Sequence, residues 1–266
     1  WETTGSKKIY NAMMAVGNDS THWKPGKRWF HADDIAISQM YIDLYRKEKR
    51  PEMLNATIEA LDRFLKEPYP TSGKKDIIKW WWCDALFMAP PTLIKLGIVT
   101  NNNSYLEYND KCFKECYDLL YNKKEHLFAR DLGYVVKGNK EDRVEANGKL
   151  IFWGRGNGWV LGGLAEMLQD FPKNDKNRKF YEELFVTLSA RVAELQSADG
   201  FWHASMLDPA SYPSPETSAT GFIVYALAYG VNEGLLDKDT YLPIVEKGWK
   251  ALVSAVETDG KLGYVQ

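Results

Sequence analysis

The chain has 266 residues, of which 45% are hydrophobic and 26% are charged, as in an ordinary folded globular protein. Its 34 basic and 36 acidic side chains leave a formal net charge of −2, which gives no electrostatic reason to expect nucleic acid or a membrane as a partner. The three cysteines, at positions 83, 112 and 116, are few and odd in number, which argues against a disulfide framework. We therefore expect them to be buried thiols. The four histidines lack metal-ligand spacing, and we expect neither a metal nor a cofactor.

Apolar side chains recur at helical spacing almost throughout the chain. This pattern predicts helices over about 34–48, 52–66, 84–97, 104–121, 160–168, 180–195, 217–230 and 242–256. Two short stretches, 134–136 and 150–152, read as strands and predict a small hairpin. The chain is therefore expected to be all-helical, with one catalytic domain over residues 1–266.

Two loops repeat after amphipathic helices. An Asp-Gly turn followed by further loop occurs at Asp199-Gly200 and again, 60 residues later, at Asp259-Gly260. This period indicates stacked or closed helical hairpins, although two common turn dipeptides could also coincide. Hairpins of about 60 residues would number roughly four and a half in this chain, so we expect the native protein to have further helices beyond both ends of this sequence or near residues 4–7.

Four segments are unusually polar, aromatic or rich in glycine: 30–34, 80–91, 152–159 and 208–218. In the first, Asp33 or Asp34 could simply cap a helix. In the second, Asp84 follows three tryptophans, and an acid among apolar rings has a raised pKa, as a general acid requires near neutral pH. Capping is again the alternative for Asp84.

The third segment places Arg155 between glycines and tryptophans, where it could bind a carboxylate or form a structural ion pair. Its glycines do not have the spacing of a dinucleotide-binding fingerprint. The fourth segment is a loop stiffened by three prolines, which could line a pocket, with Ser214 capping the next helix and Glu216 in its first turn.

Together these motifs, Phe-His-Ala-Asp-Asp, Trp-Cys-Asp-Ala-Leu-Phe-Met-Ala-Pro-Pro, Phe-Trp-Gly-Arg-Gly-Asn-Gly-Trp and Tyr-Pro-Ser-Pro-Glu-Thr-Ser, resemble those of glycoside hydrolase family 105. The resemblance covers most of the chain and is nearest to the clade of polysaccharide-degrading Bacteroidetes. It implies an (α/α)6 six-hairpin barrel, incomplete if the hairpin count above is right. The reaction it implies is removal of a terminal 4,5-unsaturated uronic acid from oligosaccharides left by a polysaccharide lyase, through acid-catalysed hydration of the enol ether.

The same resemblance implies the site residues. Asp84 matches the catalytic acid and Asp33 a second carboxylate, with Asp34 as the alternative. Arg130 stands where other family members carry a histidine, which leaves open whether the uronide is glucuronyl- or galacturonyl-derived. The substrate-binding residues implied are His31, Asp34, Trp82, Met88, Arg130, Trp153, Arg155 and Trp159.

Two other kinds of function stay open at this stage. The chain could be another helical-barrel glycosidase or a sugar epimerase, although an epimerase would be expected to show paired histidines. It could also be a noncatalytic carbohydrate-binding protein that keeps the aromatic pocket, although the intact motif around Asp84 argues against this. An oligosaccharide is the expected partner, and the family context favours the periplasm or the cell exterior.

Overall fold

The computed structural model describes residues 1–67 and 79–266, and it is mostly helical, which confirms the predicted all-α class. The described residues form two compact units, one from 1–79 and 88–112 and the other from 80–87 and 113–266. The prediction of one catalytic domain over residues 1–266 stays a prediction. None of the described helices is long and apolar enough to cross a membrane.

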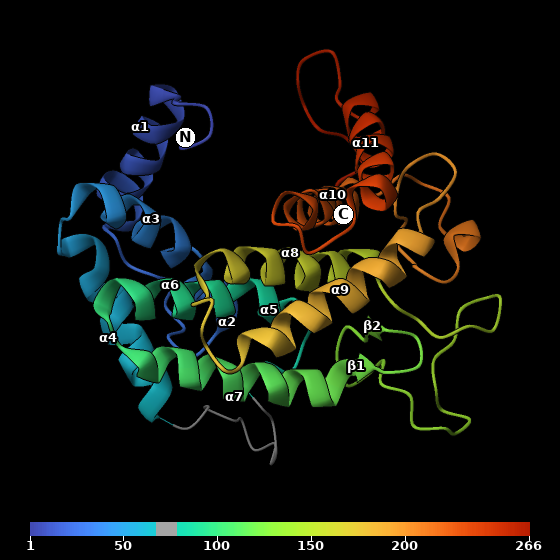
Figure 1. The fold of residues 1–266 in the computed structure, drawn as a ribbon, viewed down its shortest axis with the longest axis horizontal. Helices are drawn as coiled ribbons and strands as arrows, with labels where there is room; N and C mark the ends of the chain where they lie inside the picture. The colour runs from blue at the N-terminus through green and yellow to red at the C-terminus, as the bar shows by residue number, and fades with distance from the viewer. Residues whose placement is uncertain (68–78) are drawn as a thin grey trace. The chain divides into compact units, whose positions relative to one another are not determined.

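The first unit is built from helices drawn from blue through cyan to green in Figure 1. In chain order they are α1 (Lys7–Ala15), the π-helical turn η1 (Val16–Thr21), α2 (Ala32–Ala36), α3 (Ser38–Glu48), α4 (Glu52–Lys66), α6 (Pro90–Thr100) and the first part of α7 (Asn103–Leu120). Helix α3 contacts α2, α4 and α6. Its apolar face closes over Trp23, whose ring meets that of Tyr41 edge to face with centroids 5.4 Å apart.

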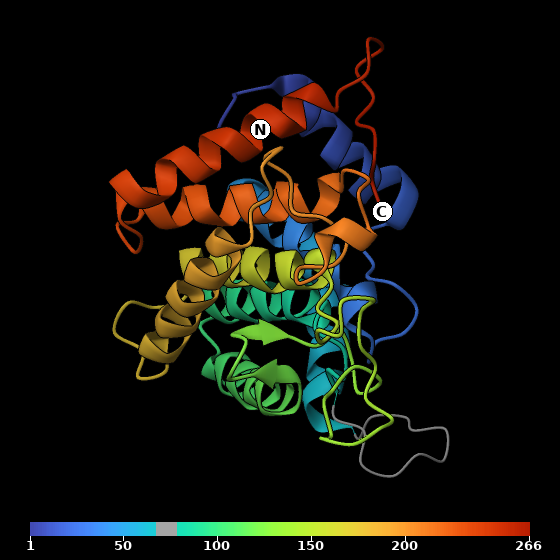
Figure 2. The ribbon, with the colours of Figure 1, turned by 90° about the vertical axis from the view of Figure 1, so that its right-hand side faces the viewer.

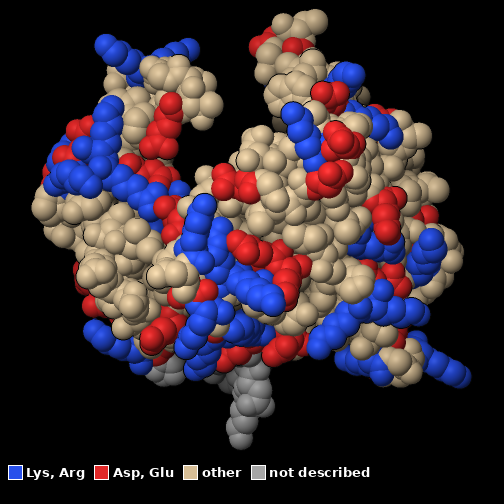
Figure 3. Space-filling view, viewed as in Figure 1, with Lys and Arg blue, Asp and Glu red and all other residues tan. Residues whose placement is uncertain are grey.

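The second unit packs its helices around α8. Its elements are α5 (Ala85–Met88, of which Met88 belongs to the first unit), the end of α7, strands β1 (Tyr121–Asn122) and β2 (Leu127–Phe128), α8 (Gly154–Asp170), α9 (Arg178–Glu194), the 3-10 turn η2 (Pro209–Ser211), α10 (Thr217–Asn232) and α11 (Lys238–Ser254). Helix α8 contacts α9, α10 and β2, and α10 and α11 lie side by side (Figure 2). Acidic and basic side chains are interspersed over the face shown in Figure 3, in keeping with the small net charge.

Glycines let α8 approach its neighbours at backbone distance. A Cβ at Gly163 would lie 2.3 Å from the carbonyl oxygen of Leu86, and one at Gly154 would lie 2.3 Å from the carbonyl oxygen of His203. A Cβ at Gly158 would lie 3.3 Å from the Cα of Ala219 in α10. The glycines of the Phe-Trp-Gly-Arg-Gly-Asn-Gly-Trp segment therefore serve packing, which positions the first turn of α8 closely.

The structure corrects two sequence predictions. The helix expected over 84–97 is two helices, because Pro90 and Pro91 have no N–H to donate and instead begin α6. The strands expected at 134–136 and 150–152 are wrong: the first stretch is loop, and the second makes a single bridge between Leu150 and Val144. The two-stranded hairpin lies earlier, at β1 and β2.

The repeated turn is the same structure at both predicted places. Gly200 and Gly260 have φ of +92° and +86°, and in each turn the preceding Asp accepts a hydrogen bond from the backbone N–H that follows the glycine. A third copy, which the sequence analysis did not include, occurs at Asn147-Gly148, where Gly148 has φ of +79°. Three copies of one turn support a repeated supersecondary unit.

Candidate functional site

Asp84 lies at the centre of the candidate site in the second unit, just before α5. The segment that carries it is held by an antiparallel bridge between Trp82 and Asp131 and by the backbone N–H of Cys83, which donates to the carbonyl of Arg130 over 2.8 Å. Trp82 is buried, with 6% of its surface exposed, and Asp84 is half-buried. The backbone just before Asp84 is therefore held by the segment that carries Arg130 and Asp131.

Burial raises the pKa of the Asp84 carboxyl. A hydrogen bond from the Cys83 thiol and the positive charges of Arg155 and Arg130 act in the opposite direction and only partly offset that rise in pKa. The carboxyl therefore keeps its proton to higher pH than an exposed aspartic acid does, which is the condition for a general acid. The predicted environment of Asp84 is present in the structure.

Arg155 and Trp159 lie one turn apart on the same half-buried face of α8. Within the described residues, the Arg155 guanidinium forms neither a hydrogen bond nor an ion pair, which leaves its five N–H donors for a ligand. The N-cap residue Trp153 provides no side-chain cap, and the backbone N–H of Gly154 donates to the carbonyl of Ala204 over 2.8 Å. The N–H groups of Arg155 and Gly156 have no acceptor among the residues that the structure describes. Trp159 instead packs on Phe222 and Phe87, with ring centroids 3.9 and 4.7 Å away.

The Trp153 indole stands between two tyrosines. Its ring meets Tyr134 and Tyr212 edge to face, with centroids 6.3 and 5.9 Å apart. Tyr212 also donates a hydrogen bond to the buried carboxylate of Glu145 over 3.3 Å. The three rings and the carboxylate form a partly exposed wall next to the start of α8. The sequence predicted Trp153 as a site residue and Tyr212 only as part of the loop that could line a pocket.

Arg130 follows β2 and forms an ion pair with Asp131, its neighbour in the chain. Its side chain is 41% exposed, so it can contact a ligand while the pairing limits its rotamers. The structure therefore brings Asp84, Arg130 and Arg155 into electrostatic contact in one unit.

His31, Asp33 and Asp34 lie together in the first unit, at the start of α2. We expected Asp33 or Asp34 to cap this helix, but the N-cap residue is His31. Its Nδ1 accepts a hydrogen bond from the backbone N–H of Asp33 over 3.3 Å. Asp34 accepts three hydrogen bonds from Arg28: one from the backbone N–H at 2.8 Å, one from Nε at 2.9 Å and one from Nη2 at 2.5 Å. Although burial raises the pKa of Asp34, these contacts prevail and lower it. Asp33, by contrast, is half exposed and lies 3.5 Å from the His31 ring nitrogen.

The structure also shows the roles of Met88, predicted to bind substrate, and of the loop before α10, in which Ser214 was predicted to be the N-cap. The carbonyl of Met88, in the first unit, accepts hydrogen bonds from Gln39 and Thr92. The cap expected at Ser214 is wrong: Glu216 is the N-cap of α10 and accepts from the backbone N–H groups of Ser218 and Ala219. The two carboxylate oxygens of Glu216 each accept from one of these free amides.

Asn157 is a residue that the sequence analysis missed. It is fully buried, its Oδ1 accepts from the backbone N–H of Phe128 over 2.8 Å, and its Nδ2 donates to the carbonyls of Phe128 and Trp153. One amide thus fastens β2 to the first turn of α8, in the manner of a paired strand residue. A polar residue within a run of glycines and apolar positions was the available signal.

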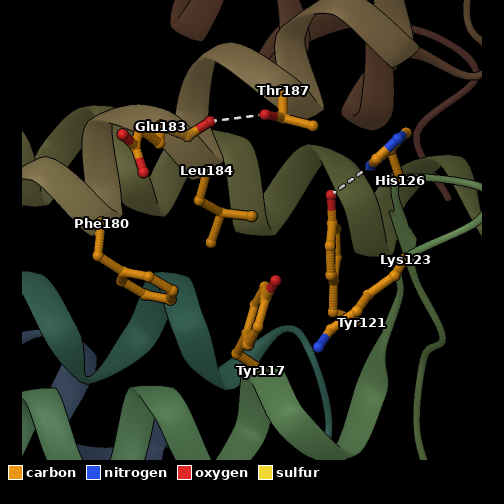
Figure 4. Close-up of a pocket in the computed structure, with 8 residues that line it drawn as sticks. All are labelled: Tyr117, Tyr121, Lys123, His126, Phe180, Glu183, Leu184 and Thr187. Carbon is orange, nitrogen blue, oxygen red and sulfur yellow. Dashed lines mark hydrogen bonds between the residues drawn. The ribbon is translucent and has the colours of Figure 1, made fainter.

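The second unit also contains a cavity of about 340 Å³ beside α7 and α9 (Figure 4). It is lined by Tyr117, Tyr121, Lys123, His126, Phe180, Glu183, Leu184 and Thr187. The Tyr121 hydroxyl is 2.9 Å from His126 Nδ1. None of the predicted site residues lines this cavity, and it has no acid in an environment like that of Asp84.

A sequence model described as Glycosyl Hydrolase Family 88 matches residues 1–266. The chain belongs to this family. It is therefore a glycoside hydrolase, as predicted. An "Unsaturated 3S-rhamnoglycuronyl hydrolase" of Formosa agariphila is 47% identical over 266 residues, an alignment that covers 96% of this chain and 70% of that protein.

Solved structures agree with this family assignment. A structure described as glycosyl hydrolase family 88 from Bacteroides vulgatus has a TM-score of 0.89 at 30% identity and covers 99% of this chain and 77% of that one. A structure described as a polysaccharide lyase has the same TM-score at 35% identity and covers 99% of this chain and 76% of that one. The helical fold expected from the family resemblance is thereby confirmed.

Proposed function

We propose that this family 88 hydrolase removes a terminal 4,5-unsaturated uronic acid from oligosaccharides, with Asp84 as the general acid. The observation that carries the proposal is the half-buried Asp84 carboxyl, whose pKa is raised by burial in the presence of two arginines. A protonated acid beside fixed cations suits a substrate that is itself an anion and must be protonated on carbon.

The reaction follows from the chemistry of the unsaturated sugar. Its C4–C5 double bond is an enol ether, so a proton from Asp84 to C4 leaves positive charge shared by C5 and the ring oxygen. Water then adds at C5 and loses a proton, which restores the acid. The resulting hemiketal opens, and the neighbouring sugar leaves. One water is consumed, and no pair of carboxylates flanking the glycosidic bond is required.

The uronate carboxylate is assigned to Arg155 in this proposal. Its guanidinium forms no hydrogen bond or ion pair in the described part of the chain, and a planar fork can hold a carboxylate through two parallel hydrogen bonds. The uncapped first turn of α8 adds backbone donors and the positive end of the helix dipole. Trp153, ordered by its two tyrosines, offers an apolar surface for a sugar ring.

The neighbouring sugar is proposed to be rhamnose. The support is the name of the relative from Formosa agariphila, which acts on an unsaturated rhamnoglycuronyl substrate and is 47% identical to this chain. For Asp33, the role of second carboxylate stays a prediction from the family resemblance.

The test is turnover of oligosaccharides generated by a polysaccharide lyase. Wild-type enzyme should remove the ultraviolet absorbance of the conjugated double bond, and in heavy water deuterium should appear at C4. Asp84→Asn keeps the shape but has no acidic proton, and a general acid contributes ~10²–10⁴-fold in rate, so activity should fall by at least that factor. A fully active Asp84→Asn variant, or product without deuterium at C4, would refute the proposal.

The solved structure described as a polysaccharide lyase suggests one alternative reaction. A lyase forms the double bond instead of consuming it, so absorbance would rise when the enzyme is mixed with intact polysaccharide. Both substrates should be tested in parallel. Rising absorbance on intact polysaccharide, with no loss on the unsaturated oligosaccharide, would favour the lyase.

A further inference from the structure

The thiol next to the proposed acid is held in a defined place. Cys83 is fully buried, and its Sγ donates a hydrogen bond to Asp84 Oδ1 over 3.3 Å. From the other side, a Cβ at Gly156 would lie 3.0 Å from that sulfur and 3.8 Å from Oδ1, so the first turn of α8 closes over this contact. The backbone N–H of Cys83 is bound to Arg130, which fixes the main chain as well.

We propose that Cys83 is a positioning residue for the acid: its S–H holds Oδ1 of Asp84, so that the acidic proton is carried on Oδ2 and presented there to C4 of the substrate. The inference rests on the proposed role of Asp84. It gives a chemical part to a residue that, from the sequence, is expected to be only a buried structural thiol.

The electrostatics of the pair support a donor role for the thiol. Burial and the neighbouring Asp84 charge raise the pKa of Cys83 well above its ordinary value, so the sulfur keeps its hydrogen over the working pH range. A carboxyl oxygen that already accepts from S–H is the poorer place for the acidic proton. The other charged groups that act on Asp84 are Arg155 and Arg130, which are both permanently positive, so neither can change the protonation of the pair as the pH varies.

Removal of the thiol should shift the pH profile of the enzyme in one direction. A donor to the carboxylate lowers the pKa of Asp84, so its removal should raise that pKa. Because the protonated form is the active one, activity is lost as pH rises through this pKa. The alkaline limb of the kcat/KM profile should therefore move to higher pH in Cys83→Ala, by about half a pH unit to one unit for a hydrogen bond of ordinary net strength. At lower pH, kcat should fall several-fold with KM little changed, because the acidic proton is no longer confined to Oδ2.

The experiment measures the pH profiles of wild type, Cys83→Ala and Cys83→Ser on a lyase-generated oligosaccharide. Serine has a hydroxyl donor and should return the alkaline limb and kcat toward the wild-type values. Cys116→Ala removes a buried thiol of the same unit that acts on Cys83 but is not among the groups that act on Asp84, and it should leave the limb in place. If Cys83→Ala does not fold, Cys83→Val fills the volume without a donor and gives the same comparison.

The outcomes separate this inference from the proposed function. An unmoved alkaline limb in Cys83→Ala, or a serine variant that behaves like the alanine variant, would overturn the positioning role while Asp84→Asn stays inactive. A merely structural role would lower activity without moving the limb. If wild type does not consume the double bond, or Asp84→Asn remains active, the proposed function itself fails.

Discussion

The backbone of Gly163 in α8 touches the carbonyl of Leu86, just after the proposed acid, so closely that a Cβ on Gly163 would lie 2.3 Å from the Leu86 oxygen and 2.7 Å from the Phe87 Cα. Real Cβ atoms do not approach backbone this closely, and neither partner is a flexible side chain. The contact sets the distance between α8 and the segment that carries Asp84.

We expect Gly163→Ala to destabilise the protein by about 1–3 kcal/mol or more, because the added methyl must push two backbone segments apart. Gly221→Ala is the matched control. It lies within α10, where a Cβ would meet nothing within 4 Å, and it should stabilise the helix by about 0.5–1 kcal/mol. Urea unfolding of both variants measures the difference. Equal free energies of unfolding for the two variants would contradict the close contact.

Asp84→Asn should raise stability at neutral pH while it abolishes activity. Burial raises the pKa of Asp84, so between its unfolded value, about 3.9, and its folded value the native state binds more protons than the unfolded state. The free energy of unfolding of the wild type therefore falls as pH rises through this window, and asparagine does not incur that loss. The Tm difference should favour the variant at pH 7 and vanish below about pH 4. A variant that is less stable than wild type at pH 7 would contradict this account.

Arg155→Lys should weaken substrate binding more than it slows the chemical step. Lysine keeps the charge but loses the planar fork that holds a carboxylate by two hydrogen bonds. We expect KM to rise about tenfold, the equivalent of one lost charge-assisted hydrogen bond, with the Tm unchanged because Arg155 bonds to nothing in the described residues. Steady-state kinetics and a thermal melt are sufficient. Unchanged KM would show that another group binds the uronate.

The two aspartates of α2 should behave differently when each is changed to asparagine. Asp34→Asn breaks the ion pair with Arg28 and should cost about 1–3 kcal/mol of stability, discounted toward the lower figure because Arg28 is half exposed. Asp33→Asn, at a half-exposed side chain, should leave stability unchanged and lower kcat if Asp33 is the second carboxylate. Melting curves and kinetics of both variants decide this. Normal kcat in Asp33→Asn would remove Asp33 from the reaction.

Helical periodicity predicted most of the helices, because the apolar spacing of an amphipathic helix can be recognised within its own sequence. The helix over 52–66 has the predicted bounds, and that over 104–121 differs by one residue at each end. The break before Pro90 was also readable, since Pro90 and Pro91 have no N–H to continue a helix that began earlier in the chain. Strands were wrongly predicted at 134–136 and 150–152, because an apolar triplet becomes a strand only if another segment pairs with it. The sequence alone does not show whether such a partner exists.

The site was predictable in its residue types and not in their contacts. Aromatic neighbours of Asp84 in the sequence were sufficient to predict a raised pKa. By contrast, the thiol of Cys83 points at Oδ1 because Gly156, far along the chain, leaves room for it, and this is a tertiary fact. The same holds for Asp34, whose role depends on a loop that returns Arg28 to it.

The buried amide of Asn157 makes Arg130 and Arg155 parts of one mechanical unit. Asn157 holds both backbone polar groups of Phe128, two residues before Arg130, and it lies two residues after Arg155 on the same turn of α8. A change that shifts one arginine is thus transmitted to the other through a single side chain. The effects of substitutions at Arg130 and Arg155 should therefore be strongly non-additive. A chimera that takes β2 from one relative and the start of α8 from another should lose activity, because its two arginines come from different proteins.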